Sequence, residues 1–162
     1  MAESVNINKK LSLEEQYELL LPQVKALISS EENFLSNLSN FTAILKQSFD
    51  KISWIGFYLF DGEKLYLGPF QGKVACSQIR IGNGVCGASA QEQKTIIVPD
   101  VYKFPEHIFC DADSKSEIVI PILKDEKLLG VLDLDSAEYN SFNETDQKYL
   151  EALCIYLADK IF

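Results

Sequence analysis

The hydrophobic pattern of this chain changes its period twice, and this change constrains the fold more than any other feature of the sequence. Apolar residues recur at helical spacing near both ends, whereas the middle is rich in β-branched and aromatic residues separated by turn signals. Helices at both ends with strands between them are typical of α+β domains. The length of 162 residues fits one such domain.

We expect three long helices and two β-hairpins. Pro22 predicts a kink or a break in the first helix, and Asn143 or Thr145 is expected to cap the last one. Between the hairpins, residues 84–93 are expected to form a short helix, and residues 95–101 are expected to contain a short strand that ends at Pro99. The long helices are expected within residues 12–30, 34–49 and 143–162, and the hairpins within residues 52–70 and 116–136.

Charge and N-terminal sequence exclude several classes of function. The net charge is -9 and Lys and Arg form no cluster, which argues against a nucleic-acid-binding protein. Residues 1–10 are polar, which indicates a flexible tail, and they contain no apolar run of the kind found in a signal peptide. No apolar stretch of the sequence is long enough to span a membrane. We therefore expect a cytoplasmic protein whose four cysteines are reduced thiols.

Three of the four cysteines are candidates for chemistry. Cys154 lies in the apolar stripe of the last helix and is expected to pack in the core. Cys76, Cys86 and Cys110 lie in loops or at element ends, where a thiol can be activated. They could be incidental thiols, a zinc site with His107, or a redox pair in which one cysteine attacks and another forms a disulfide with it. The spacing lacks the paired knuckles of structural zinc, so we expect no metal.

Two further groups of residues are candidates for a binding site. Asp133 and Asp135 are two apart, so their side chains lie on one face of a strand, and Glu117 begins the neighbouring strand. Such a face is either solvated or, if buried, costly unless a ligand occupies it. Trp54 and Tyr58 also share one face of their strand and are either core aromatics or a pocket wall.

Three long runs of sequence resemble one known family. GPFQGKVACSQIRIGNGVCGASA (68–90), VPDVYKFPEHIFCDADSKSEIVIPI (98–122) and GVLDLDS (130–136) are similar to the free methionine-(R)-sulfoxide reductases, which are built on a GAF domain. The resemblance covers nearly everything from Ser53 to the C-terminus and includes all three family cysteines. It implies a single GAF domain over residues 11–162, with a central antiparallel sheet and the terminal helices packed on one side of it.

The resemblance implies an enzyme that reduces free L-methionine-(R)-sulfoxide to methionine without a cofactor. Cys110 would be the nucleophile and would be left as a sulfenic acid. Cys76 would condense with it to a disulfide, which thioredoxin would reduce. Cys86 would be an alternative resolving thiol, a relay or a part of the pocket wall. Glu106 and Phe109 are larger than the Gly and Ala expected in this family, which bears on the loop shape and on access to the pocket.

The resemblance also implies the contacts of the substrate. Three carboxyl groups would bind its sulfoxide oxygen and ammonium, and their clustering should raise the pKa of at least one of them. Two aromatic rings would contact the methyl group of the substrate, and backbone amides at the start of the short helix would bind the substrate carboxylate. His107 would lower the pKa of the Cys110 thiol or orient its loop. The residues expected to contact the substrate are Glu117, Asp133 and Asp135; Trp54 and Tyr58; and Val85, Cys86, Gly87 and Ala88.

Two other classes of function stay open. Many GAF domains bind small ligands and regulate partners, so the chain could be a non-catalytic sensor of a small molecule or of oxidation. It could also be a structural dimer module, because long apolar helices can pair across a two-fold axis. We expect a homodimer in each case. An enzyme is distinguished by turnover of free methionine sulfoxide.

Overall fold

The computed structural model describes residues 7–105 and 113–162, and within them the predicted α+β fold is confirmed. Six strands form one antiparallel sheet in the order β3-β2-β1-β6-β5-β4. The elements are α1 (Leu13–Leu27), α2 (Phe34–Ser48), β1 (Trp54–Phe60), β2 (Lys64–Gln71), β3 (Gln78–Arg80), α3 (Gly84–Glu92), β4 (Ile96–Val98), the 3-10 turn η1 (Val101–Lys103), β5 (Ser116–Lys124), β6 (Lys127–Ser136) and α4 (Glu144–Ile161). The predicted tail over residues 1–10 falls mostly outside the described part and stays a prediction.

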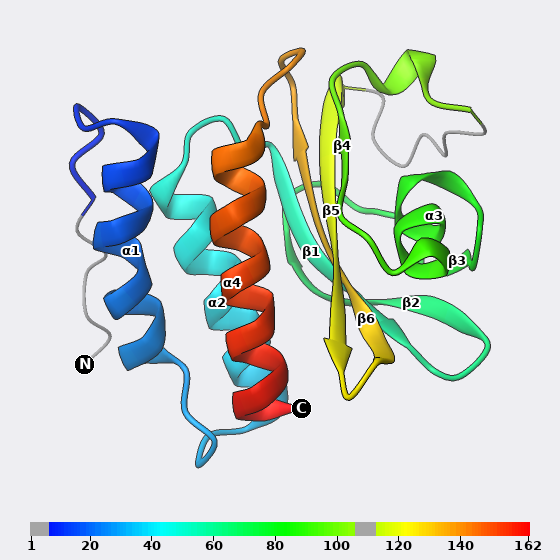
Figure 1. The fold of residues 1–162 in the computed structure, drawn as a ribbon, viewed down its shortest axis with the longest axis horizontal. Helices are drawn as coiled ribbons and strands as arrows, with labels where there is room; N and C mark the ends of the chain where they lie inside the picture. Colours follow the sequence, from blue (N-terminus) through cyan, green and yellow to red (C-terminus); the bar gives the residue numbers. More distant parts are fainter. Residues whose placement is uncertain (1–6, 106–112) are drawn as a thin grey trace.

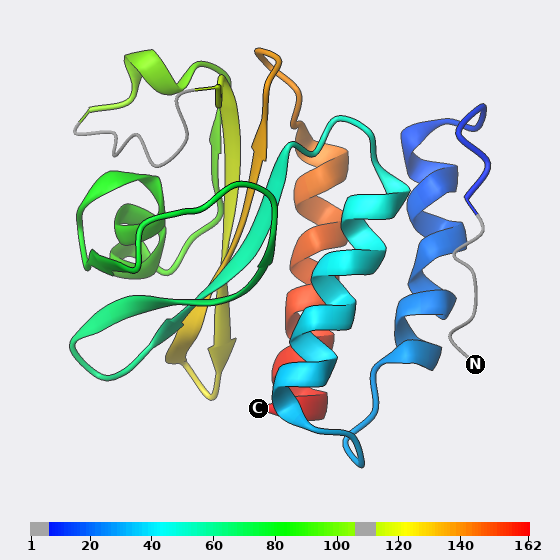
Figure 2. The ribbon, with the colours of Figure 1, turned by 180° about the vertical axis from the view of Figure 1, so that it is seen from behind.

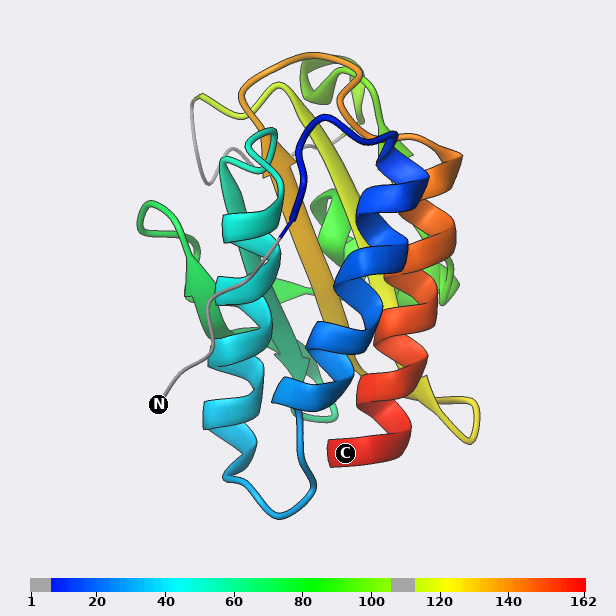
Figure 3. The same ribbon diagram turned by 90° about the vertical axis from the view of Figure 1, so that its left-hand side faces the viewer.

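The helices are divided unequally between the two faces of the sheet. α2 and α4 lie against one face, and α1 packs outside them (Figure 1). Seen from that side, the three helices run side by side across the strands (Figure 3). The opposite face carries α3, with η1 beyond one end of it (Figure 2). The predicted packing of the terminal helices on one side is therefore confirmed, and no helix in the described ranges has the length and apolar character to cross a membrane.

Side-chain caps fix where the long helices begin. Ser12 accepts a hydrogen bond from the backbone of Glu15, whose carboxylate accepts one from the backbone of Ser12. Asn33 caps α2, and Asn143 and Asp146 form the same reciprocal arrangement at the start of α4. Each cap satisfies backbone N–H groups that have no partner inside the helix.

The structure differs from the sequence prediction in two details. Of the two outcomes predicted for Pro22, the break is not found, because α1 continues through it to Leu27, and the kink stays a prediction. The proline ring is exposed, while Leu20 and Val24 on either side are buried, so packing holds the helix across the missing hydrogen bond. The glycine-rich region also contains β3, whose three residues are too few to show a period in the sequence.

A buried ion pair joins the helical layer to the sheet. Asp146 of α4 is fully buried and accepts hydrogen bonds from the Tyr17 hydroxyl of α1 at 2.8 Å and from the Lys51 ammonium before β1 at 2.7 Å. Its second oxygen also accepts from the Asn143 backbone at 3.0 Å. One carboxylate therefore connects α1, α4 and the entry to β1.

Replacing Asp146 by Asn should destabilise the fold by about 3 kcal/mol, because the Lys51 ammonium loses its charged partner in a buried setting. The matched control is Asp50→Asn, which breaks the exposed Lys9–Asp50 pair and should change the free energy of unfolding by less than about 1 kcal/mol. Urea denaturation followed by circular dichroism measures both. Equal effects of the two substitutions would contradict the role assigned to the buried pair.

Candidate active site

The sheet face opposite the long helices brings the predicted binding residues together. Asp135 of β6 lies directly between Trp54 of β1 and Glu117 of β5 in the strand register. Asp133, two residues earlier, lies on the same face and pairs with Val119 of β5. This face is covered by α3 rather than solvated, as Figures 1 and 2 show.

Three reactive groups meet beneath the first turn of α3. Each of three residues offers one potential ligand atom, and these three atoms lie within 4.8 Å of one another: the Sγ of Cys86 and one carboxylate oxygen each of Glu117 and Asp133. The exposed fractions of these residues are 4%, 5% and 6%, so the groups are almost fully withdrawn from water. The cluster contains two of the three predicted carboxylates and one predicted cysteine, and the half-buried Asp135 lies beside it.

Burial and mutual repulsion favour the protonated forms of the groups in this cluster. Burial raises the pKa of Glu117 well above its usual range, and the charges of Asp133 and Asp135 raise it further. Burial also raises the pKa of Asp133, with Asp135 adding to the effect. The pKa of the Cys86 thiol is raised by burial and then by the same two buried acids. Cys86 therefore lies in surroundings that favour a thiol over the nucleophilic thiolate.

One oxygen of the cluster is unsatisfied. Asp133 Oδ1 is buried and has no hydrogen-bond partner among the described residues. A buried acceptor without a partner is costly, so a site of this kind is suited to a ligand that brings a donor.

A serine that the sequence analysis did not single out holds the third carboxylate. The buried hydroxyl of Ser114 donates a hydrogen bond to Asp135 Oδ1. Ser114 lies four residues after Cys110 and three before Glu117, so it links the cysteine segment to the acids. Its position between two predicted site residues was the available signal, but serine in a loop has many other roles.

The two predicted aromatic residues form a stacked wall on the same face. The ring of Trp54 stacks on Phe70 at a centroid distance of 5.5 Å and on Tyr58 at 6.1 Å. Gly56 makes this possible, because a Cβ atom there would lie 2.3 Å from the Trp54 ring. A Cβ atom on Gly72 would lie equally close to the indole, at 2.4 Å, and the φ of +141° at this position also suits glycine.

The same aromatic residues hold the segment that carries Cys76. Trp54 Nε1 donates to the Lys73 carbonyl at 2.9 Å, and the Tyr58 hydroxyl donates to the Cys76 carbonyl at 3.1 Å. An exposed ion pair between Lys73 and Asp113 connects this segment to the chain before β5. The wall of the site and the position of Cys76 are thus coupled.

The start of α3 presents backbone amides beside the cluster. Val85 and Gly87 are buried, and Ala88 is half-buried. A Cβ atom on Gly87 would lie 2.4 Å from the Arg80 carbonyl, so glycine allows this turn to pack closely on the preceding loop. Within the described chain, Asn83 makes no capping hydrogen bond with its side chain, which suits an anion at this helix end.

The cysteines are placed differently from one another. Cys154 is buried in the helical core, as predicted. Cys76 is half-buried and disulfide-bonded. Cys110 and His107 lie outside the described residues, as do Glu106 and Phe109, so the pairing of Cys76 with Cys110 stays a prediction.

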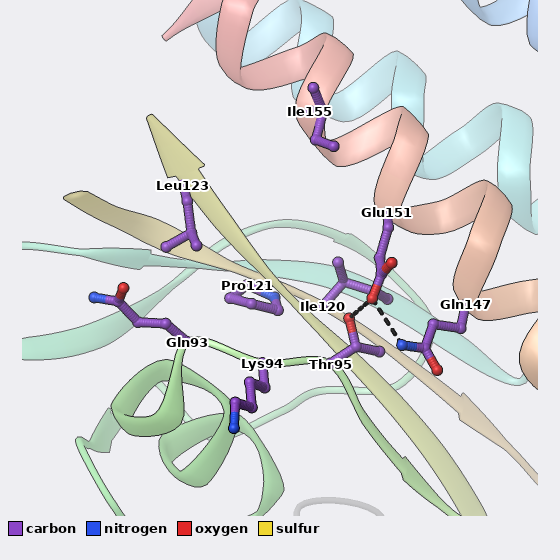
Figure 4. Close-up of a pocket in the computed structure, with 9 residues that line it drawn as sticks. All are labelled: Gln93, Lys94, Thr95, Ile120, Pro121, Leu123, Gln147, Glu151 and Ile155. Atoms are coloured by element: carbon purple, nitrogen blue, oxygen red, sulfur yellow. Dashed lines mark hydrogen bonds between the residues drawn. The ribbon is translucent and has the colours of Figure 1, made fainter. Parts of the chain in front are cut away.

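A separate pocket of about 410 Å³ lies between α4, β5 and the segment that joins α3 to β4. Figure 4 shows Glu151 as its carboxylate, which accepts hydrogen bonds from Thr95 at 2.5 Å and from Gln147 at 2.8 Å. The described residues that line this pocket include no cysteine, and the Glu151 carboxylate already has partners. It therefore lacks the chemistry of the cluster on the opposite face.

Comparison with known proteins decides the family. The profile of the GAF domain matches residues 38–161, from the middle of α2 to the end of α4. The chain belongs to the GAF domain family. The GAF fold predicted from the resemblance is therefore confirmed.

Three relatives show where in the GAF family the similarity is high. The chain is 56% identical over 151 residues to GAF domain-containing protein A of Dictyostelium discoideum, covering 93% of this chain and 94% of that protein. It is 44% identical to the free methionine-R-sulfoxide reductase of Saccharomyces cerevisiae, covering 94% and 89%. The X-ray structure of free methionine-R-sulfoxide reductase from Neisseria meningitidis in complex with its substrate superposes with a TM-score of 0.92 at 39% identity, covering 96% and 93%. The predicted resemblance to these reductases is confirmed.

Replacing Glu117 by Gln should stabilise the fold increasingly as the pH rises. The folded protein retains the Glu117 proton above the ordinary pKa of about 4.3, whereas the unfolded chain releases it, so the wild-type protein loses stability between that pH and the raised pKa. The variant should gain about 1.4 kcal/mol per pH unit over this window. Urea denaturation between pH 4 and 8, roughly the window of this linkage, measures it. Glu63→Gln, at an exposed site, is the control, and parallel curves for wild type and Glu117→Gln would contradict the prediction.

Proposed function

We propose that the chain reduces free L-methionine-(R)-sulfoxide to methionine at the cluster beneath α3. The observation that carries the proposal is the pair of buried acids Glu117 and Asp133, with an unsatisfied oxygen on Asp133, beside the wall of Trp54 and Tyr58. The names of the yeast and Neisseria relatives support it, because the chain covers most of both proteins.

The arrangement of charge favours a free amino acid over a peptide. Asp133 and Asp135 offer oxygens to an ammonium group, and the amides of Val85 and Cys86 in the first turn of α3 offer donors to a carboxylate, whereas the Gly87 amide already donates to the Asn83 carbonyl at 3.0 Å. A methionine sulfoxide inside a polypeptide has amide groups at both places, so the buried acids would remain uncompensated. The stacked wall then receives the methyl end of the side chain.

The chemistry assigns the proton to a buried acid. The Cys110 thiolate attacks the sulfoxide sulfur, and the oxygen accepts a proton from a carboxyl group before the S–O bond breaks. Glu117 is suited to this donation because its pKa is raised well above the usual range by burial and by Asp133. Oxygen and one proton pass to Cys110 as a sulfenic acid, and methionine leaves with the electron pair.

A second thiol completes the cycle. The Cys76 thiol attacks the Cys110 sulfenic acid, forms a disulfide and releases water. A dithiol such as thioredoxin, in the cytoplasm, then reduces the disulfide by exchange. The disulfide-bonded state of Cys76 and its hydrogen-bonded position next to the wall support this role. In this proposal Cys86 forms part of the pocket wall. We also propose that the active enzyme is a homodimer.

The intact protein should turn over free L-methionine-(R)-sulfoxide with thioredoxin recycling, and not the S epimer or a sulfoxide-containing peptide. Cys110→Ser should abolish the turnover because it removes the nucleophile. NADPH consumption through thioredoxin reductase measures the rate. If the folded and reduced protein binds methionine sulfoxide but does not reduce it, the proposal is wrong and the sensor function is favoured.

Asp133→Asn should lower kcat/KM by about 10- to 100-fold, mainly through a higher KM, because the ammonium loses a carboxyl group that can release its proton on binding and become its charged partner. Steady-state kinetics with the free R sulfoxide measures the change. Glu151→Gln, in the pocket of Figure 4, is the control and should leave kcat/KM unchanged. An unchanged KM in Asp133→Asn would remove this residue from the substrate site.

A further inference from the structure

We infer that Cys86, Glu117 and Asp133 together bind a single Zn²⁺ ion, which occupies the place proposed for the amino group of the substrate. The three side chains come from α3, β5 and β6 and converge in one buried volume. Zn²⁺ takes no part in the proposed reaction.

The donor set suits zinc. Zn²⁺ is bound by thiolate, imidazole and carboxylate ligands, and three protein ligands plus one water form a common four-coordinate site. The three potential ligand atoms lie within 4.8 Å of one another. Bonds of about 2.0–2.3 Å draw such atoms somewhat closer together, which small rotations of the Glu117 and Asp133 side chains can supply.

The unsatisfied oxygen is the second observation. Asp133 Oδ1 is buried inside the cluster and has no hydrogen-bond partner among the described residues. A cation directly satisfies a lone pair that the protein leaves without a donor. The thiol of Cys86 discriminates between cations, since Mg²⁺ and Ca²⁺ require more oxygen ligands than the cluster offers.

Zinc at this place would inhibit the enzyme reversibly. Binding releases the proton of the Cys86 thiol and those of the Asp133 and Glu117 carboxyl groups to solvent, so that one thiolate and two carboxylates hold the ion. The ion then holds the oxygens of Asp133 and Glu117 that the ammonium and the sulfoxide oxygen of the substrate need. This competition rests on the proposed function, whereas the binding of the metal does not.

Co²⁺ in place of Zn²⁺ tests the site directly. A thiolate bound to Co²⁺ gives a charge-transfer absorption band in the near ultraviolet, which carboxylates alone do not give. Protein reduced with a phosphine, which binds metals weakly, should show this band with one Co²⁺ per chain, and Zn²⁺ should remove it. Cys86→Ser should abolish the band and weaken Zn²⁺ binding at least about 100-fold, while Cys76→Ser, the matched control, should retain both.

Three results would overturn the inference: no band in the wild-type protein, an undiminished band in Cys86→Ser, or a band lost in Cys76→Ser alone. If Cys86→Ser does not fold, Asp133→Asn and Glu117→Gln carry the test. Each should keep the band and weaken Co²⁺ binding at least about tenfold. Unchanged affinity in both variants would equally overturn the inference.

The failure of this inference is separable from failure of the proposed function. Turnover without a charge-transfer band leaves the reductase and removes the zinc site, whereas a band without turnover does the reverse. Free methionine should raise the apparent Kd for Co²⁺ more than glycine does, because both chelate the metal in solution and only methionine fills the pocket. Equal effects would refute the shared position.

Discussion

The burial of carboxyl groups on an otherwise apolar sheet face is the constraint on which the rest of the structure depends. Glu117 and Asp133 are withdrawn from water beneath α3, and their environment favours the protonated forms. Such groups reduce the stability of the folded state at neutral pH. The opposite face compensates, since three helices and their core pack there without an acidic cluster of this kind among the described residues.

Glycines adapt the backbone to this buried site. Gly56 and Gly72 leave room for the indole of Trp54, and Gly87 brings the first turn of α3 close to the loop after β3. A side chain at any of these positions would displace the wall or the helix that covers the acids. The geometry of the site therefore depends on the absence of a Cβ atom at these three glycines as well as on the side chains that line the site.

The sequence predicted the parts of the fold that depend on local interactions. Helical spacing located the three long helices, and Asn143 caps the last one as predicted. The second hairpin was also predicted, and Asp125 and Glu126, with positive φ angles, form its turn. The strand order could not be predicted without the family resemblance, because β1 pairs with β6, and these two strands lie far apart in the sequence. β3 was missed since three residues carry no periodic signal.

The site was predictable only in part for the same reason. The spacing of Asp133 and Asp135 placed both on one face, and the register then put Glu117 opposite Asp135. The meeting of Cys86 with these acids depends on how α3 packs, which no spacing in the sequence reports. Ser114 was overlooked because its hydrogen bond to Asp135 is a tertiary contact.

The two faces of β6 divide its residues between different tasks. Leu132 and Leu134 point into the helical core, whereas Val131, Asp133 and Asp135 point toward α3. Substitutions at successive positions of this strand should therefore alternately affect the packing of the core and the residues of the candidate site. Selection can alter the ligand that such a domain accepts at every second position while the intervening residues preserve its architecture, which gives one scaffold room to evolve new specificities without first losing its shape.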